Sequence, residues 1–521
     1  MAKWRWWLPL WLAVLSGWTA RGAARDPAEV RLRRLVELPP VAFQLTLRVD
    51  LRHGWVFTGD DWLAARQRDR LQKELDAGAA DPMAWARLAG LSDLAGEKAA
   101  FHLALSRALA AFEREGIRQS RDDARVARYA ECLLWNGRLE EAASFLRTKT
   151  AAIADGWRSR LVYARVLLLQ GARAQARRDQ AGLDPATLEG QARELADAAV
   201  SLVPKEAEAY LGRALVRAGI SLARTLRQPP EGTEPAVAVA AATFPGEATP
   251  DLRQAARLAP DNPRVWAIRV WHELLGHAFG PGHGGPKSFP ANIAWDRLPA
   301  ELQATVRETL ANLHRIGAAG EPPTAALALD AAGGLELFVL RDARRAEETL
   351  RRAVALDAGL DRAWEQLTLA LIESRRFDEL CLVCEARLKS RDTPRTRVML
   401  AKAQDRAGQK LEAFITLSEA REAFPKDPLV NLALSALWLR DALGGGDLNN
   451  PAVLLQTAQA GLEKSPPRDL LRNLLFQQGV LLALAGRPDR ARQAFERLVQ
   501  LNPSDDRARE ALAVVEEMLN R

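Results

Sequence analysis

Residues 472–503 read RNLLFQQGVLLALAGRPDRARQAFERLVQLNP, and the architecture of the chain is plainest there. Apolar and small residues recur at helical spacing on both sides of Gly486, and Pro503 closes the stretch because proline cannot continue a helix. The marker residues are Leu475, Gly479, Leu482, Gly486, Ala491, Phe495 and Pro503. This pattern predicts two helices joined by a tight turn, with small residues where the helices approach closely.

The same pattern recurs earlier in the chain, where its markers are Leu400, Ala401, Gly408, Ala413, Leu417, Ala420 and Pro425. Units start near residues 327, 361, 394, 428 and 472, a spacing of about 34 residues except in the last unit, which a loop at 444–451 lengthens. The chain therefore resembles the tetratricopeptide repeat family, whose helix–turn–helix units are stable only when stacked on their neighbours. The resemblance implies an all-α solenoid, a superhelix of helical hairpins.

The first 24 residues have the signature of a signal peptide. Lys3 and Arg5 precede an apolar run at 6–18, and small residues at 22–24 suit a signal peptidase site. A cleaved signal would make the protein exported, in the periplasm or outside the cell, with no stable membrane insertion. The alternatives are an inner-membrane anchor formed by the uncleaved segment, or a cytoplasmic regulator that the same segment tethers to the membrane.

Residues 25–60 have a different pattern and form a predicted N-terminal extended or β cap segment. Apolar residues alternate with polar ones from Val41 to Leu51, which indicates a strand, and His53-Gly54 can turn the chain into a second strand at 55–58. An isolated hairpin is unstable in water. It must pack on the first helices, which we favour, or pair with another chain.

The remaining residues divide into three predicted regions. Residues 61–227 form an N-terminal repeat array, and 228–326 form an irregular helical linker with insertions rich in proline and glycine. Residues 327–521 form the C-terminal array, which ends in a capping helix at 505–520.

Charge and cysteine content exclude several classes of protein. The formal net charge is +7, but lysine and arginine alternate with acidic residues and form no basic stripe, so we predict no nucleic-acid partner. Three cysteines are too few for a disulfide framework. Cys381 and Cys384 form a CxxC pair inside a predicted helix, where buried small apolar residues are expected rather than a redox site.

One segment suggests an enzyme. His272 and Glu273 are followed by His277 and His283, and zinc proteases place two histidines four residues apart with a glutamate beside them. Here the separation is five, so a shared metal would need a bend at Gly276. The alternative function is thus a metal-dependent hydrolase with a site around His272, His277 and His283, to which the repeats recruit substrate.

The resemblance implies a different kind of site, the concave groove lined by positions 2, 5, 9 and 12 of each first helix. Those positions include six charged residues: Arg158, Arg165, Arg362, Glu365, Arg395 and Lys402. Basic groups beside aliphatic carbons suit acidic or carboxylate groups of a peptide. We therefore predict a non-enzymatic scaffold of the cell envelope, without cofactor or metal, that binds peptides or helices of other proteins.

Overall fold

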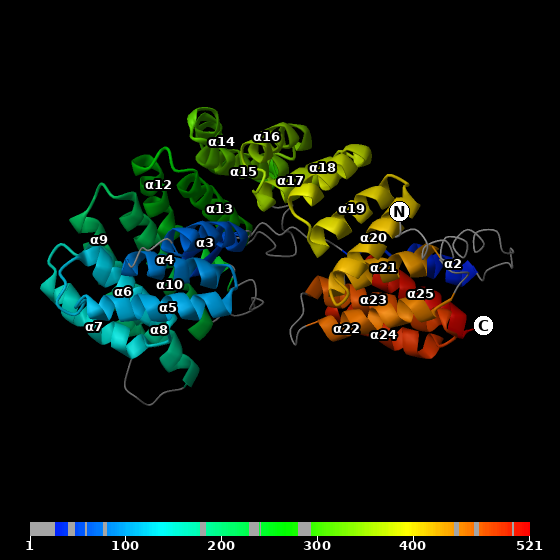
Figure 1. Ribbon diagram of the computed structural model, residues 1–521, viewed down its shortest axis with the longest axis horizontal. Coiled ribbons are helices and arrows are strands. Elements are labelled where there is room, and N and C mark those ends of the chain that lie inside the picture. Colours follow the sequence, from blue (N-terminus) through cyan, green and yellow to red (C-terminus); the bar gives the residue numbers. More distant parts are fainter. Residues whose placement is uncertain are drawn as a thin grey trace. The chain divides into compact units, whose positions relative to one another are not determined.

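The computed structural model describes residues 27–39, 47–57, 60–76, 81–177, 184–228, 239, 241–279, 293–441, 447–462, 468–502 and 505–520. The chain divides into two compact units, one of residues 44–370 and one of residues 1–43 together with 371–521. In each unit, helices follow one another in pairs (Figure 1). The predicted all-α helical-hairpin fold with a short N-terminal β element is thereby confirmed for the described residues.

In unit 44–370 the first helices of the pairs are α4, α6, α8, α10, α13 and α15, and each packs on its second helix. The elements are β1 (Leu47–Asp50), β2 (Gly54–Phe57), α3 (Asp60–Asp76), α4 (Pro82–Leu94), α5 (Lys98–Arg114), α6 (Asp123–Trp135), α7 (Leu139–Ala152), α8 (Trp157–Arg177), α9 (Pro185–Leu202), α10 (Ala207–Arg227), α12 (Thr249–Leu258), α13 (Pro263–Phe279), α14 (Ala300–Ala319), α15 (Pro322–Phe338) and α16 (Ala343–Leu356). The helices from α10 to α15, which include the predicted linker, pack in unbroken succession.

In the other unit the first helices are α19, α21 and α23, and α25 covers the last pair. The elements are α2 (Pro27–Arg34), α18 (Phe377–Ser390), α19 (Pro394–Arg406), α20 (Lys410–Ala423), α21 (Pro428–Asp441), α22 (Asn449–Gly461), α23 (Arg468–Leu484), α24 (Pro488–Leu501) and α25 (Asp506–Leu519). A further first helix, α17 (Asp361–Glu373), contains the division between the units.

Local sequence explains where helices begin and where the chain turns. The side chain of Asp122 accepts hydrogen bonds from the backbone N–H groups of Ala124 and Arg125, which caps α6. The turn after α6 contains Gly137 and the turn after α23 contains Gly486, with φ of 75° and 72°. Only glycine adopts this left-handed conformation without strain, so these residues end their helices.

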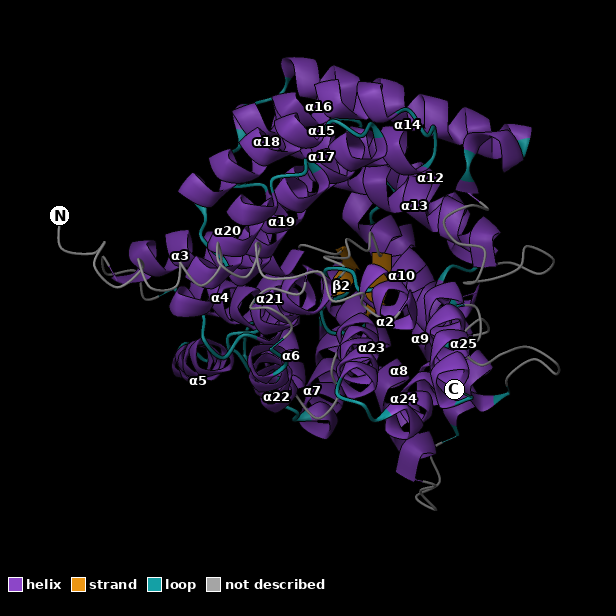
Figure 2. Cartoon of the chain, turned by 90° about the vertical axis from the view of Figure 1, so that its right-hand side faces the viewer, coloured by secondary structure: helices purple, strands orange, loops and turns teal. Residues whose placement is uncertain are grey.

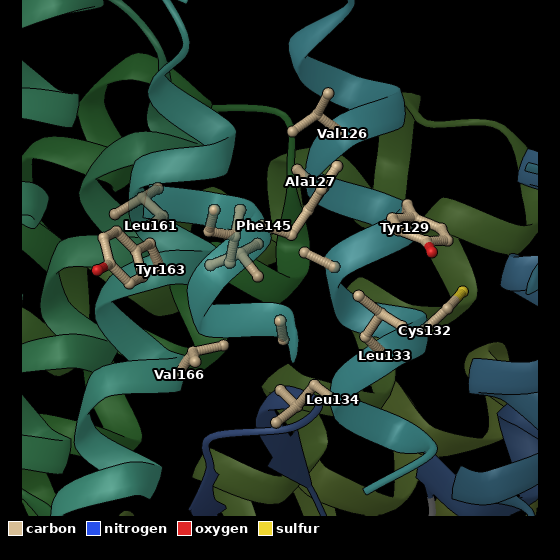
Figure 3. Packing of buried hydrophobic residues seen from close by; sticks show 14 of the residues in the cluster. Val126, Ala127, Tyr129, Cys132, Leu133, Leu134, Phe145, Leu161, Tyr163 and Val166 are labelled. Carbon is tan, nitrogen blue, oxygen red and sulfur yellow. The ribbon is translucent and has the colours of Figure 1, made fainter. Parts of the chain in front are cut away.

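The core consists of aromatic and aliphatic side chains shared between successive pairs. Figure 3 shows part of it, where residues of α6, α7 and α8 converge. The ring of Tyr129 lies edge-on between Phe112 and Phe145, with centroid distances of 5.7 and 5.0 Å. Each ring belongs to a different helix, so no pair can bury its apolar face alone.

Small residues stand where paired helices touch, as the repeat predicts. A Cβ atom on Gly479 of α23 would lie 2.7 Å from Cζ of Phe495 on α24. Any larger residue at 479 would therefore force the two helices apart.

The structure pairs β1 and β2 antiparallel, with Leu47 opposite Phe57 and Asp50 opposite Gly54. Figure 2 shows the two short strands in orange among the helices. In such a pair the side chains of Leu47, Val49, Trp55 and Phe57 share one face.

Observed helices agree with the expected starts at 361, 394 and 428, whereas α15 and α23 begin slightly earlier than expected. Two expectations are wrong. Residues 27–34 form α2 rather than an extended segment, and Asn449–Pro451 begin α22 rather than complete a loop. Each expectation was based on local composition, which packing against other helices overrides. Helix α13 continues through Gly276, where a shared metal would need a bend.

Candidate binding grooves

The β1–β2 hairpin lies against first helices of unit 44–370. Its polar partners are Asp93 of α4, Trp135 of α6, Arg165 of α8, Leu211 of α10 and Arg264 of α13. We call this lined face the hairpin groove.

Arg165 holds the turn of the hairpin through backbone atoms. Its Nε donates to the carbonyl oxygen of Leu51 and its Nη2 to that of Arg52, both at 2.6 Å. The third nitrogen, Nη1, donates to Glu131 at 2.9 Å. Arg165 is buried, and the carboxylate of Glu131 fixes its direction, so the guanidinium recognises a polypeptide backbone rather than particular side chains.

Trp135 and Asp93 contact the same turn from the neighbouring helices. The indole Nε1 of Trp135 donates to the carbonyl of Arg52 at 3.2 Å, and the His53 ring stacks on the indole at 5.8 Å. Asp93 accepts from His53 at 2.9 Å and pairs with Arg52 at 3.2 Å. The groove therefore supplies both a donor for the backbone and a carboxylate for basic side chains.

Strand β2 places two aromatic side chains in the same groove. The indole of Trp55 donates to the carbonyl of Leu211 at 3.3 Å, while Arg264 Nη2 donates to the carbonyl of Trp55 at 2.7 Å. The guanidinium groups of Arg264 and Arg362 lie 5.8 and 5.6 Å from the centre of the Phe57 ring, within cation–π range.

Arg362 owes its position to a buried carboxylate. Its Nε donates to Asp330 of α15 at 2.5 Å, and Gln366 donates to the other carboxylate oxygen at 3.2 Å. Asp330 is fully buried, so removal of Arg362 would take away an ion pair from a buried carboxylate.

The hairpin fills only part of the groove. A cavity of about 590 Å³ remains beside β2, a size typical of ligand sites. Apolar side chains dominate its wall, among them the half-buried Leu63, Leu91, Leu94 and Leu327. Arg264 and Arg362 add guanidinium groups to the same wall.

In the other unit, residues 27–39 occupy an equivalent face, which we call the α2 groove. Ala28, Leu32, Val36 and Leu38 are buried in one apolar cluster with side chains of α19, α21, α23 and α25. Arg33 donates to the carbonyl of Leu439 at 2.6 Å. The first helices of both units thus hold pieces of the chain's own N-terminal segment.

The rim of the α2 groove is charged. Glu37 pairs with Arg507 at 2.5 Å, and Arg31 pairs with Glu517 at 2.9 Å. Burial lowers the pKa of Lys402, and the positive charge of Arg406 lowers it further. The nearby carboxylates of Glu37 and Asp405 oppose this effect and raise the pKa.

Two of the six predicted groove residues, Arg165 and Arg362, contact the β1–β2 hairpin. Arg158 instead pairs with Glu208 at 3.7 Å and stacks on the ring of Trp157. Glu365 is half-buried on α17. Arg395 and Lys402 are half-buried on α19.

Sequence reasoning missed Asp93, Trp135 and Arg264. They contact the hairpin only because helices far apart in sequence lie side by side, and no local pattern marks them.

The proposed metal segment lies in a different environment. The ring of His272 is buried edge-on between Trp55 and Phe244, at 5.6 and 5.8 Å, and neither ring nitrogen has a hydrogen-bond partner among the described residues. Desolvation lowers its pKa to about 4. His283 lies outside the described residues, and those described hold no cluster of three metal-ligating side chains.

The cysteines are buried, as expected for apolar packing. Burial raises the pKa of Cys381 to about 11 and that of Cys384 to about 12. Burial also raises the pKa of Cys132. Thiols with such pKa values are poor nucleophiles at neutral pH.

The sequence was compared with models of known families and with curated proteins, and the helices were checked for length and polarity. Residues 472–515 match the tetratricopeptide repeat family. No curated protein is recognisably similar in sequence. Within the described part of the chain, every helix is too short or too polar to cross a membrane.

Solved structures with similar helical repeats are distant. A tetratricopeptide repeat protein from Parabacteroides merdae is 13% identical, with 52% of this chain and 91% of that chain covered and a TM-score of 0.34. The Cut9–Hcn1 hetero-tetramer of the APC/C is 15% identical, with 89% of both chains covered and a TM-score of 0.34. The human IFIT1 dimer with m7Gppp-AAAA is 15% identical, with 86% and 95% covered and a TM-score of 0.33.

At this level of likeness, neither the ligands nor the assemblies of those proteins transfer to this chain. The family match at the C-terminal end and the stacked helix pairs agree with the marker residues of the repeat. Residues 472–515 therefore match a tetratricopeptide repeat, and the described helix pairs have the helical-hairpin fold that the resemblance implies.

Proposed function

We propose that this protein is a non-enzymatic scaffold of the cell envelope that binds polypeptide segments of other proteins along its first helices. The observation that carries the proposal is the way Arg165 holds the hairpin, through the carbonyl oxygens of Leu51 and Arg52. A site that reads backbone carbonyls accepts polypeptides of varied sequence.

The charge pattern favours proteins over nucleic acids as partners. Arg165 and Arg362 are neutralised by Glu131 and Asp330, so the hairpin groove offers hydrogen-bond donors without a free basic stripe. In the other unit, we assign the orientation of acidic partner groups to Arg395 and Lys402, at groove positions of α19.

Photo-crosslinking in the native cells tests groove binding. A photoreactive residue at Leu327, which lines the cavity, should capture partner proteins. The same residue at Leu103, which is 53% exposed on the second helix α5, is the matched control and should capture none. Adducts only from Leu103 would place partner binding on the outer face and contradict the proposal.

The proposal that the protein is exported depends on residues 1–24, the predicted signal peptide, and a separate experiment tests it. The intact mass of the protein purified from its cells should lack these residues. A full-length mass would favour the membrane anchor and would leave groove binding untouched.

A further inference from the structure

We propose that the hairpin groove is a binding site for an extended segment with two aromatic side chains at alternate positions, and that the chain's own hairpin is its resident competitor. This inference rests on the proposed function. It names the chemistry of the partner and the step that precedes binding, which is displacement of residues 47–57.

The occupied groove shows which ligand it fits. Trp55 and Phe57 are two residues apart on one strand and point to the same face, and both are buried among side chains of α10 and α13. Their rings meet the carbonyl of Leu211 and the guanidinium groups of Arg264 and Arg362. A partner with an aromatic–X–aromatic strand could make these same contacts.

The backbone contacts are equally transferable. Arg165 and Trp135 donate to carbonyls of the turn, and Arg264 donates to the carbonyl of Trp55. Every polypeptide offers such carbonyls. The contacts therefore define a strand-binding site without requiring the side chains of this particular hairpin, apart from the two aromatic rings.

The cavity beside β2 is the place where a partner segment would first bind, before it displaces the hairpin. It is bordered by Trp55, Val56 and Phe57 on the hairpin side and by Leu327 and Leu360 on the helix side. A partner segment that enters this space lies next to the aromatic residues before it replaces them. Displacement then proceeds stepwise, and the whole groove is never empty.

Covalent linkage favours the resident hairpin. A tethered ligand has an effective concentration of about 1 mM, so a free segment with an intrinsic Kd of about 10 μM would bind roughly 100-fold more weakly to the intact protein. Loosening the hairpin should therefore raise the affinity for a free segment, whereas fixing the hairpin should abolish binding.

A reversible disulfide between the hairpin and α10 allows the fixed and the loosened hairpin to be compared in the full chain. A Cβ atom on Gly219 of α10 would lie 2.9 Å from Cδ2 of Leu51, so the two positions are in contact, and we choose the double variant Leu51→Cys, Gly219→Cys to lock the hairpin by a disulfide. The native cysteines are buried and do not compete. The probe is a fluorescent peptide of residues 47–57 with alanine in place of Leu51, so that it clears the side chain added at position 219, and its binding is measured by anisotropy.

We expect the reduced variant to bind the peptide at least tenfold more tightly than the oxidised variant, with the wild type between them. Equal affinity in the two states, once mass spectrometry confirms the disulfide, would overturn the proposal. Absence of peptide binding in both states would also overturn it. If partner adducts at Leu327 persisted in that case, the scaffold function would stand without the competing hairpin.

Variants of the groove verify the location once the chain's own hairpin no longer competes. In the reduced double variant that also carries Trp55→Ala and Phe57→Ala, Arg165→Gln should weaken peptide binding at least tenfold because it removes two donors to the carbonyls of the peptide. Arg344→Gln on α16 is the matched control, since the Arg344 side chain is 89% exposed, and it should leave binding unchanged. Equal loss in both variants, or in neither, would refute the assignment of the groove.

Discussion

Replacing His272 with leucine measures how well the hairpin groove excludes water. The ring is 1% exposed and lies between the rings of Trp55 and Phe244. Leucine has a similar volume and no polar atoms, so it suits an apolar site that leaves both ring nitrogens without partners among the described residues. At pH 8, where the ring is neutral, we expect the variant to be as stable as the wild type or more stable.

The prediction becomes quantitative at acid pH. The pKa of His272 falls from 6.5 to about 4 on folding, so the unfolded chain binds the extra proton between these values. The wild type therefore keeps its full stability above pH 6.5 and loses stability as pH falls from 6.5 towards 4. At pH 5 this loss is about 2 kcal/mol, and His272→Leu removes it.

Urea unfolding followed by tryptophan fluorescence at pH 8 and pH 5 provides the assay. Other groups titrate in both proteins, so the gain of the variant over the wild type isolates His272. We expect that gain to be larger at pH 5 by about 2 kcal/mol. His102 is exposed on α5, and His102→Leu is the matched control, for which we expect a much smaller pH effect. The same gain at both pH values for His272→Leu would refute the buried, neutral ring.

Two further predictions concern packing. Gly479→Ala should destabilise the protein by about 1–3 kcal/mol in urea unfolding, because its Cβ would lie 2.7 Å from Cζ of Phe495. Gly190→Ala, with no atom within 4 Å of the added Cβ, should be neutral or stabilising by up to about 1 kcal/mol, and equal losses at both sites would contradict this account. Iodoacetamide at pH 8 should leave all three cysteines unlabelled in the native protein and label them in urea, by mass spectrometry. Rapid labelling of Cys384 in the native state would show that this thiol is accessible.

Much of the fold could be predicted because its signals are local. The turns at Gly408 and Gly486 need a left-handed backbone, and proline at 394 and 428 starts helices where it was expected to. Where a turn carries a different residue, the signal weakens. Arg375 has a φ of 55° in the turn between α17 and α18, a position that glycine occupies in other repeats.

The site was predictable only in part. Arg165 and Arg362, at groove positions of the repeat, both contact the hairpin, since helical periodicity places such positions on one face of their helices. Their partners were not predictable. Glu131 and Asp330 lie on neighbouring first helices, and their approach depends on how successive pairs stack.

The sequence alone determined that helix pairs repeat along the chain, because about 34 residues contain the whole signal for one unit. Only the tertiary structure decided what lies on the first helices. Arg165 meets Leu51 across 114 positions, and Arg33 meets Leu439 across 406. Such contacts depend on the stacking of many units, so no local pattern records that the N-terminal segment occupies the two grooves.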